Sequence, residues 1–340
     1  MNVAAKKFYQ DRFMDLSKYR LERCALGAEW DAAVERSPQG TIFATSAVLA
    51  CLKGARPGLW SVWKDRQRVA GLCVVESEDG RAAIANDVVI YAGVMFEPAP
   101  AEQSRAQTVA EQFRITSFCT ARLVELYDDI FLNFAPAFVD IRPFLWHNYG
   151  TDGAHFVPDV RYTSMIDLAP NPGGGAETDP VYLNASKSRR QQIRYGRGDG
   201  VTTETSTAVD VIGDLYVQSF ARQGKSVDQA SIDELVGVTR SLIEHQCGQL
   251  YVTRTAKGDI GSAAVFGWDR KRAYYLYGGN APDLRDDHTG TMVLWDALLD
   301  LRARGIPEVD LEGVNSPLRG HFKLSFGGSV TPYYHLVLRK

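Results

Sequence analysis

Basic side chains are concentrated just after the middle of the chain, between residues 187 and 197. Three of them, Arg190, Arg194 and Arg197, have the spacing i, i+4 and i+7, which places them on one face of a helix. A guanidinium group binds phosphate or carboxylate through two parallel hydrogen bonds. The pattern therefore predicts a surface for a polyanion, such as the phosphates of a nucleotide-linked substrate, of CoA or of a tRNA acceptor end. The alternative is a solvated helix face, which is typical of charge runs.

A second candidate anion site is the sequence Thr289-Gly290-Thr291, which begins a long helical pattern that extends to about residue 304. The free amides of a first helical turn, together with the positive end of the helix dipole, can hold a phosphate group. The other interpretation is a threonine N-cap beside a glycine that permits close packing.

Metal-dependent and serine-hydrolase chemistry find no support in the sequence. The 6 histidines show no HExxH pattern and no His/Cys spacing of a metal site. A G-x-S-x-G nucleophile elbow is also missing. We therefore expect no metal in the site.

Composition restricts the class of protein. The chain has 340 residues, of which 45% are hydrophobic and 23% charged, which excludes a disordered or collagen-like chain. Its 38 basic and 41 acidic residues give a net charge of −3, which does not suit a protein that coats DNA. The 5 cysteines form no CxxC pair, and the apolar window at 130–141 is too short to span a bilayer. With no secretory signal at the start, we expect a soluble cytoplasmic protein that contains no membrane span.

The length is typical of two domains. Residues 169–180 concentrate proline and glycine without apolar periodicity, which indicates a linker. We therefore predict an N-terminal domain over 1–168 and a C-terminal domain over 181–340.

The two parts resemble each other. Residues 69–84 and residues 259–274 each form a strand, a turn and a second strand. A Tyr-x-Gly segment, a helical pattern and a short strand with a Val-Asp pair then follow in both parts. The preserved order favours duplication. Matching positions of the two hairpins carry the same residue types, namely Gly71 with Gly261 and Asp79 with Asp269.

The second part shows three helical patterns, at 212–220, at 231–248 and at 291–304. The second begins with a capping-box sequence, and Gly248 is expected to close it. The third helix connects the strands around Leu276 and Glu308, which lets those strands run parallel. The expected fold class is therefore α/β (mixed α+β), with two tandem domains that each contain a mixed sheet flanked by helices.

This element order, together with local motifs, resembles the GNAT superfamily, and more narrowly its tandem-domain FemAB-like branch of acyltransferases and aminoacyltransferases. The similarity covers most of residues 30–338 and is strongest after residue 160. It rests on the segments 161–168, 188–201, 277–282, 309–313 and 322–328.

The resemblance implies a sheet that splays open between its fourth and fifth strands. The acyl donor then occupies the cleft, and the amine acceptor approaches from the other side. The superfamily holds donor phosphates with a glycine-rich loop, whereas the run from Arg285 to Thr291 offers one usable glycine and two acids. This departure weakens the case for ordinary CoA pyrophosphate binding.

The resemblance also implies roles for individual side chains. Lys323 matches a lysine that binds substrate phosphate or stabilises the transition state, and it is expected just before a strand. Glu312 follows a strand and is a candidate acceptor for the amine proton, with Asp310 on the opposite face of that strand. Tyr277 is a candidate donor to the leaving group, and Asn280 a candidate for orienting the acceptor.

Two functions from different classes follow. The first is an N-acyltransferase that moves an acyl or aminoacyl group from acyl-CoA or aminoacyl-tRNA onto an amine of a small molecule or cell-envelope precursor. In that case the donor is a co-substrate and no cofactor is tightly bound. The alternative is a catalytically silent GNAT-like protein that binds a nucleotide-linked sugar or peptide.

Overall fold

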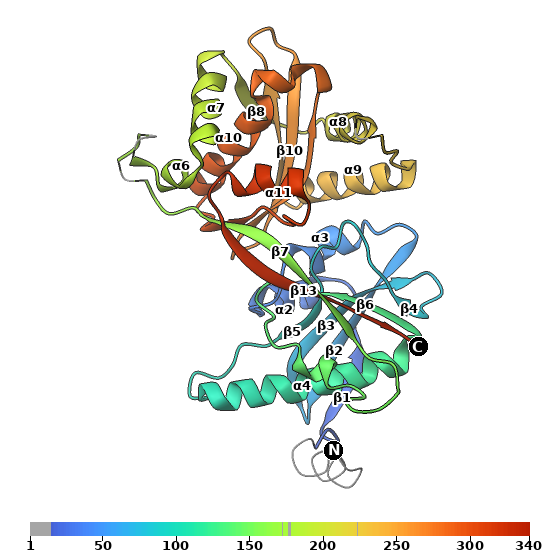
Figure 1. Cartoon of the computed structure of the whole chain (residues 1–340). Helices are drawn as coiled ribbons and strands as arrows, with labels where there is room; N and C mark the ends of the chain where they lie inside the picture. Colours follow the sequence, from blue (N-terminus) through green and yellow to red (C-terminus); the bar gives the residue numbers. More distant parts are fainter. Residues whose placement is uncertain (1–14, 172, 176–177, 223) are drawn as a thin grey trace. The chain divides into compact units, whose positions relative to one another are not determined.

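The computed structural model describes residues 15–171, 173–175, 178–222 and 224–340 (Figure 1). Contacts divide the chain into one unit that runs up to Val160 and includes Tyr333–Lys340, and a second unit, Arg161–Pro332. This division by contacts differs from the predicted boundaries at 168/169 and 180/181. The reason is strand pairing: residues 165–167 pair with 308–310, and residues 335–339 pair with 129–133. The segment 169–180 then lies within the second unit, and residues 172, 176 and 177 are outside the described part.

The first unit contains a mixed sheet. Its strand order is β1 (Tyr19–Arg23), β2 (Ala55–Lys64), β3 (Gln67–Ser77), β4 (Ala82–Ala83), β6 (Asp129–Asn133) and the end of β13 (Ser329–Arg339), with β5 (Gly93–Phe96) also paired to β3. Its helices are α2 (Ala28–Arg36), α3 (Ser46–Leu49), α4 (Arg105–Leu126) and α5 (Arg142–Leu145). The β4–β6 pair is parallel, whereas the pairs β1–β2, β2–β3 and β6–β13 are antiparallel.

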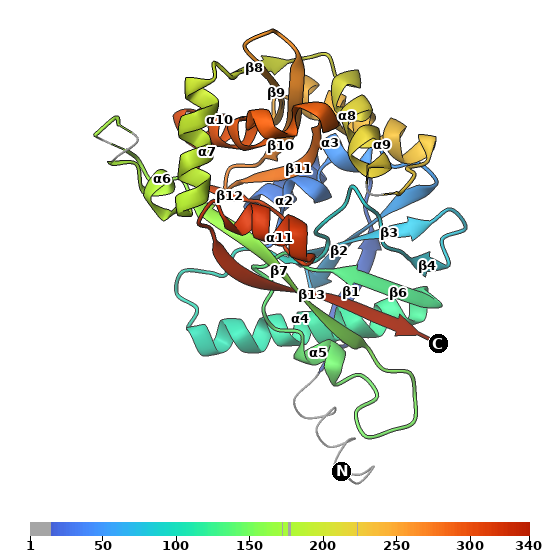
Figure 2. The same ribbon diagram turned by 45° about the horizontal axis from the view of Figure 1, so that its top comes forward.

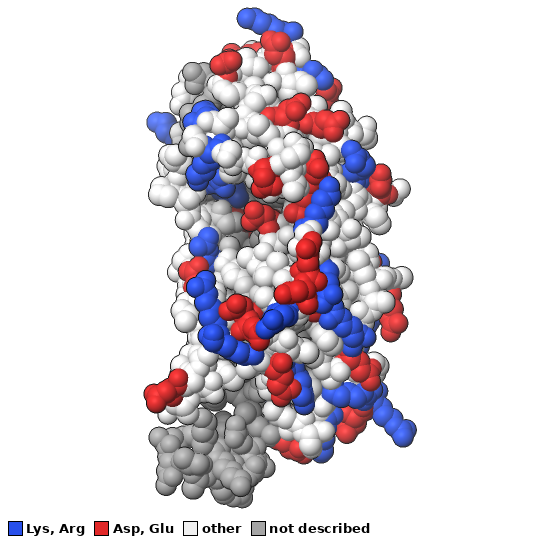
Figure 3. Space-filling model, turned by 90° about the vertical axis from the view of Figure 1, so that its right-hand side faces the viewer, with Lys and Arg blue, Asp and Glu red and all other residues white. Residues whose placement is uncertain are grey.

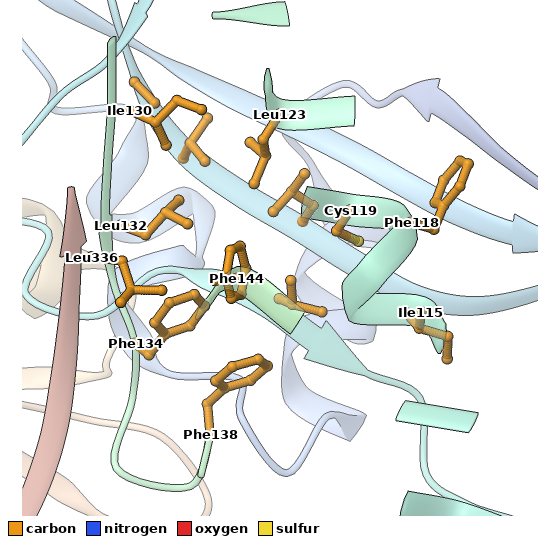
Figure 4. Packing of buried hydrophobic residues seen from close by; sticks show 14 of the residues in the cluster. Ile115, Phe118, Cys119, Leu123, Ile130, Leu132, Phe134, Phe138, Phe144 and Leu336 are labelled. Atoms are coloured by element: carbon orange, nitrogen blue, oxygen red, sulfur yellow. The ribbon is translucent and has the colours of Figure 1, made fainter. Parts of the chain in front are cut away.

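Helix α4 forms the core of this unit with the sheet. It begins with a capping box in which Ser104 accepts a hydrogen bond from the amide of Gln107, and Gln107 accepts one from the amide of Ser104. Buried side chains recur along one face of α4 and meet those of β6 (Figure 4). They include Ile115, Phe118, Cys119 and Leu123 from the helix and Ile130 and Leu132 from the strand.

The second unit contains the sheet that positions the candidate site. Its strand order is β7 (Val157–Asp167), β12 (Glu308–Asp310), β11 (Ala273–Asn280), β10 (Ile260–Trp268), β9 (Gly248–Arg254) and β8 (Thr202–Ser206). Only β11 and β12 are parallel among these neighbours, which confirms the pairing predicted from the helix between Leu276 and Glu308. The mixed-sheet fold class is therefore confirmed.

Helices cover both faces of this sheet (Figure 1). On one side lie α7 (Lys187–Gly198) and α10 (Thr289–Ala303), and α10 crosses strands β9, β10 and β11 (Figure 2). On the other side lie α8 (Asp210–Ala221) and α9 (Gln229–Glu244). Shorter elements complete the unit, namely α6 (Pro180–Asn184), the 3-10 helix η3 (Pro282–Asp287) and α11 (Pro317–Leu324).

The predicted start and end of α9 were wrong by a few residues. The N-cap is Asp228, whose carboxylate accepts hydrogen bonds from both the amide and the hydroxyl of Ser231, so Ser231 lies inside the helix. The helix ends at Glu244, and Gln246 turns the chain with a φ of 56°. Gly248 begins β9, and an added Cβ at this glycine would lie 2.5 Å from Cβ of Leu242.

None of the helices in the described part of the chain combines the length and the apolar character that crossing a bilayer requires.

Candidate active site

Strands β11 and β12 separate after only two residue pairs. Ala273 pairs with Val309 and Tyr274 with Asp310. The chain beyond Asp310 follows β7 instead, because the amide of Leu311 donates to the carbonyl of Ser164 at 2.9 Å. The second half of β11 is therefore left without a strand partner on this side among the described residues. This opening, which we call the wedge, is the splay that the resemblance implies.

A β-bulge in β11 changes which face of the sheet its side chains occupy beside the wedge. The register with β10 shifts between Val265 and Phe266, so that Leu276 becomes the extra residue. Tyr275 consequently packs beside Phe266 on the α10 side, with ring centroids 5.3 Å apart. Tyr277 lies on the α8 side, where its ring centroid is 6.4 Å from that of Tyr216. The bulge therefore gives the two tyrosines opposite faces of the sheet.

Glu312 is the most unusual side chain of the wedge. It is 6% exposed, and its Oε1 atom has no hydrogen-bond partner among the described residues. Its backbone is left-handed, with a φ of 56°, and its amide donates to Asp310 at 2.7 Å. Burial raises the pKa of Glu312 well above its usual range, Lys323 opposes this rise and Asp310 adds to it. A buried carboxyl that has a raised pKa and a free oxygen is suited to accepting a proton.

The positive φ also changes an expectation from the sequence. The predicted placement of Asp310 and Glu312 on opposite strand faces was wrong, because side chains two residues apart lie on the same face of a strand. Alternation does not apply to Glu312 in any case, since β12 ends at Asp310. Asp310 is fully buried and accepts hydrogen bonds from the hydroxyl of Thr163 and the amide of Glu312. It therefore supports the turn that presents Glu312.

Lys323 lies in helix α11, and the expected position just before a strand is corrected. Ser316 precedes the helix and Pro317 begins it, which is a favoured combination at a helix start. The Lys323 ammonium donates to the carbonyl of Gly313 at 3.4 Å and lies 5.2 Å from the ring centroid of Tyr275. Burial lowers the pKa of Lys323, while Glu312 and Asp310 act in the opposite direction. Lys323 therefore places a cation beside Gly313 and Tyr275, close to the point where β11 and β12 separate.

Helix α11 is held in place by a buried arginine that was not among the predicted site residues. Arg189 of α7 is 7% exposed, and its guanidinium carbon lies 4.4 Å and 4.6 Å from the ring centroids of Phe322 and Phe326. Burial lowers the pKa of Arg189 to about 10. Its hydrogen-bond acceptors are the neutral side chains of Ser325, Gln192 and Thr291. Arg189 therefore connects α7 with the start of α10 and with α11.

The start of α10 is tightly packed. The hydroxyl of Thr289 lies 2.8 Å from that of Ser262, and the hydroxyl of Thr291 donates to Gln192 at 2.9 Å. An added Cβ at Gly290 would lie 2.5 Å from Oδ1 of Asn280. These contacts occupy the hydroxyls, so a phosphate at this helix start would depend on backbone amides.

Asn280 belongs to the same cluster. Its Oδ1 accepts a hydrogen bond from Ser262 at 2.7 Å, and its amide donates to Ser219 at 3.0 Å. The structure thus places Asn280 between the wedge strand β11 and the start of α10. Its side-chain nitrogen has no hydrogen-bond partner among the described residues.

The basic residues of α7 separate into two groups. Arg197 forms an ion pair with Asp296 of α10. Arg194 donates to the hydroxyl of Tyr182 at 2.9 Å, and the Arg190 guanidinium lies 6.0 Å from the ring centroid of that tyrosine. Of the three arginines predicted to share a helix face, Arg190 and Arg194 thus have no carboxylate partner among the described residues. On the face shown in Figure 3, acidic and basic side chains are interspersed, in agreement with the near-neutral composition.

Comparisons with known proteins agree with this geometry. Residues 184–323 match the family model of the acetyltransferase (GNAT) domain, a range that contains all the predicted site residues. The chain is similar in structure to FemX, with a TM-score of 0.63 and 12% identity over 92% of this chain and 96% of that one. It is also similar to a tandem GNAT protein from the clavulanic acid biosynthesis pathway, with a TM-score of 0.53 and 10% identity over 94% of this chain and 98% of that one.

A further similar structure is L-PGS from Bacillus licheniformis, with a TM-score of 0.51 and 13% identity over 92% of this chain and 91% of that one. No curated protein sequence matches the chain significantly. At these identities the structural likeness establishes the fold. The resemblance to the GNAT superfamily is thus confirmed for the domain at residues 184–323, and the structural likeness confirms the fold over the whole chain. A GNAT fold supports acyl or aminoacyl transfer in general.

Proposed function

We propose that the wedge of the second unit catalyses N-acyl transfer by direct attack of an amine on an activated carbonyl. The observation that carries the proposal is Glu312, a buried carboxyl with an unpartnered oxygen where β11 and β12 separate. Burying a carboxyl oxygen without a hydrogen-bond partner costs stability, and a role in the reaction would account for its presence. A general base explains both its burial and its raised pKa.

The reaction follows from these groups. The amine nitrogen attacks the carbonyl carbon of a thioester or ester, and Glu312 accepts the proton that the nitrogen loses. The carbon–nitrogen bond forms, the carbon–sulfur or carbon–oxygen bond breaks, and the leaving group takes up a proton, for which Tyr277 is the proposed donor. The ammonium of Lys323 stabilises the negative charge that develops on the substrate. The side-chain nitrogen of Asn280 orients the acceptor.

The donor is proposed to be acyl-CoA or aminoacyl-tRNA, with its phosphates near the start of α10 and the exposed part of α7. The groups proposed to bind those phosphates are the backbone amides of Thr289 and Gly290, the turn at Thr291, and the side chains of Arg190 and Arg194. Arg197 is engaged with Asp296 and contributes less. The acceptor is proposed to be an amine of a small molecule or a cell-envelope precursor.

The test combines two donors with a panel of amines. Purified protein is incubated with acetyl-CoA or with aminoacyl-tRNA, and free thiol or deacylated tRNA is measured. Glu312→Gln is expected to lower turnover by roughly 10²- to 10⁴-fold, and Lys323→Ala to lower it as well. Lys257→Ala, an exposed lysine in the same unit, is the control and should not change turnover. Ligand binding without turnover of either donor would instead favour the silent binding protein.

A further inference from the structure

Arg319 of α11 presents a cation at the surface of the second unit. Its guanidinium carbon lies 5.5 Å from the ring centroid of Phe220 on α8. The side chain is exposed, and no carboxylate of the described residues lies within ion-pair distance of it. The neighbouring Leu318 is 87% exposed, so an apolar side chain accompanies this cation at the surface.

Arg319 and Lys323 have the spacing i, i+4 on α11. Like charges at this spacing repel each other and destabilise a helix. Lys323 lies over Tyr275 in the wedge, whereas Arg319 is one turn nearer the start of the helix and lies over α8. The helix therefore carries one cation for the reacting centre and a second one further out. An anion bound beside Arg319 would offset the repulsion between these two cations.

Aromatic side chains connect the two positions on the α8 side of the sheet. The ring centroid of Tyr216 lies 4.6 Å from that of Phe220 and 6.4 Å from that of Tyr277. All three rings are partly exposed. They form an apolar surface, which we call the aromatic wall, that extends from β11 to the Arg319 guanidinium.

We propose that the acceptor amine carries a carboxylate, which Arg319 binds while the body of the acceptor lies along the aromatic wall. This inference rests on the proposed function, because it takes the α8 side as the side from which the acceptor approaches. One unpaired guanidinium presents a planar pair of donors that matches the two oxygens of a carboxylate. A phosphate would call for additional donors, whereas the other cation of α11, Lys323, lies over Tyr275 on the α10 side of the sheet.

The first experiment measures binding without a donor. Calorimetric titrations compare amino acids and dipeptides of varied size with the matching carboxamides, which differ only in the carboxylate. The carboxylates should bind roughly 10- to 100-fold more tightly than the amides, the range expected for a charge-assisted hydrogen-bond pair. Arg319→Gln should remove this preference, whereas Arg240→Gln, an exposed arginine on α9, should retain it.

Several outcomes would overturn the inference. They are equal binding of each carboxylate and its amide, no binding of any member of the panel, and a preference that survives in Arg319→Gln. Tighter binding of phosphoethanolamine than of the amino acids would show that Arg319 binds a phosphate and not a carboxylate. Turnover separates the two proposals. Binding that depends on Arg319 without any acyl transfer would refute only the proposed function, and equal transfer to amides and carboxylates would refute only this inference.

Discussion

Glu312 and Lys323 influence each other's ionisation without forming an ion pair among the described contacts. Burial raises the pKa of Glu312 and lowers that of Lys323, and the charge of each residue opposes the shift of the other. A direct ion pair would occupy both groups and leave neither for a substrate. Their separation leaves one proton acceptor and one cation beside the same opening, as acyl transfer to an amine requires.

The first prediction concerns the pH dependence of kcat/KM. Activity should rise with pH as Glu312 loses its proton, at a pH above that of an ordinary glutamate because burial raises its pKa. Lys323→Met removes the cation that holds this pKa down, so the acidic limb should move to higher pH. The Glu312→Gln profile should lack the limb. If the acidic limbs of Lys323→Met and wild type coincide, Lys323 does not affect the pKa of the base.

The second prediction concerns stability and needs no activity. A carboxyl whose pKa is raised by folding stabilises the native state below its unfolded pKa of about 4.3, and this contribution is lost as pH rises through the folded pKa. The free energy of unfolding of Glu312→Gln should therefore increase relative to wild type between pH 5 and pH 8. Glu244→Gln, at the exposed end of α9, is the control. A difference that stays constant with pH would contradict the raised pKa.

The third prediction concerns Arg189, which we regard as a positioning residue for Lys323. Arg189→Met removes the hydrogen bonds to Ser325, Gln192 and Thr291 and should lower the free energy of unfolding by roughly 2–3 kcal/mol. Arg190→Met, next to it but partly exposed, should change the free energy by less than about 0.5 kcal/mol. Denaturant titrations give both values.

Arg189→Lys separates a positioning role from a purely stabilising one. Lysine keeps the charge but has no planar group to lie against the rings of Phe322 and Phe326. We expect kcat to fall under conditions in which the variant is fully folded, with little change in donor KM. If the folded Arg189→Lys variant keeps the wild-type kcat, Arg189 contributes to stability and does not position Lys323.

The arrangement of the second sheet was predictable because it follows from local signals. The hairpin at 259–274 and the helix before Glu308 require an antiparallel pair and then a parallel pair, and both are present. Glu312 was also predictable, since a polar residue directly after a buried strand is placed at the edge of a sheet. Its left-handed backbone and its unpartnered oxygen were not, because they depend on the neighbouring strand β7.

Long-range partners account for what the sequence did not predict. Arg197 has the same spacing signal as Arg190, yet its partner Asp296 comes from another helix. Arg189 shares the buried face of α7 with Ile193 and Gly196, and this apolar spacing was the available signal for its burial. No pattern in the sequence indicated a role for Arg319, because that role depends on its contact with Phe220 on α8.

The fourth prediction concerns the contact between Gly290 and Asn280. An alanine Cβ at Gly290 would lie 2.5 Å from Oδ1 of Asn280, so Gly290→Ala should destabilise the protein by roughly 1–3 kcal/mol. Asn280→Ala removes that oxygen and should recover part of the loss in the double variant. A double-mutant cycle measured by denaturant unfolding gives the coupling. Additive effects would show that the glycine is needed for another reason, such as a bound phosphate.

The last prediction concerns the first unit, where Glu76 is 1% exposed and receives hydrogen bonds from Arg23, Arg56 and Tyr127. Burial by itself would raise the pKa of Glu76, but the hydrogen bonds from Arg23, Tyr127 and Arg56 outweigh it and lower the pKa. A carboxyl with a lowered pKa stabilises the fold above its unfolded pKa of about 4.3, and this contribution disappears as pH falls through the folded value.

Glu76→Gln should therefore cost about 3 kcal/mol at pH 7, since it leaves two arginines without their shared carboxylate. The cost should shrink as the pH is lowered below about 4, because the wild-type carboxyl is then protonated as well. Glu78→Gln changes an exposed carboxyl on the same hairpin and should have little effect at either pH. If the thermal midpoints of Glu76→Gln and wild type differ equally at pH 7 and pH 3.5, the charge of Glu76 is not what stabilises this cluster.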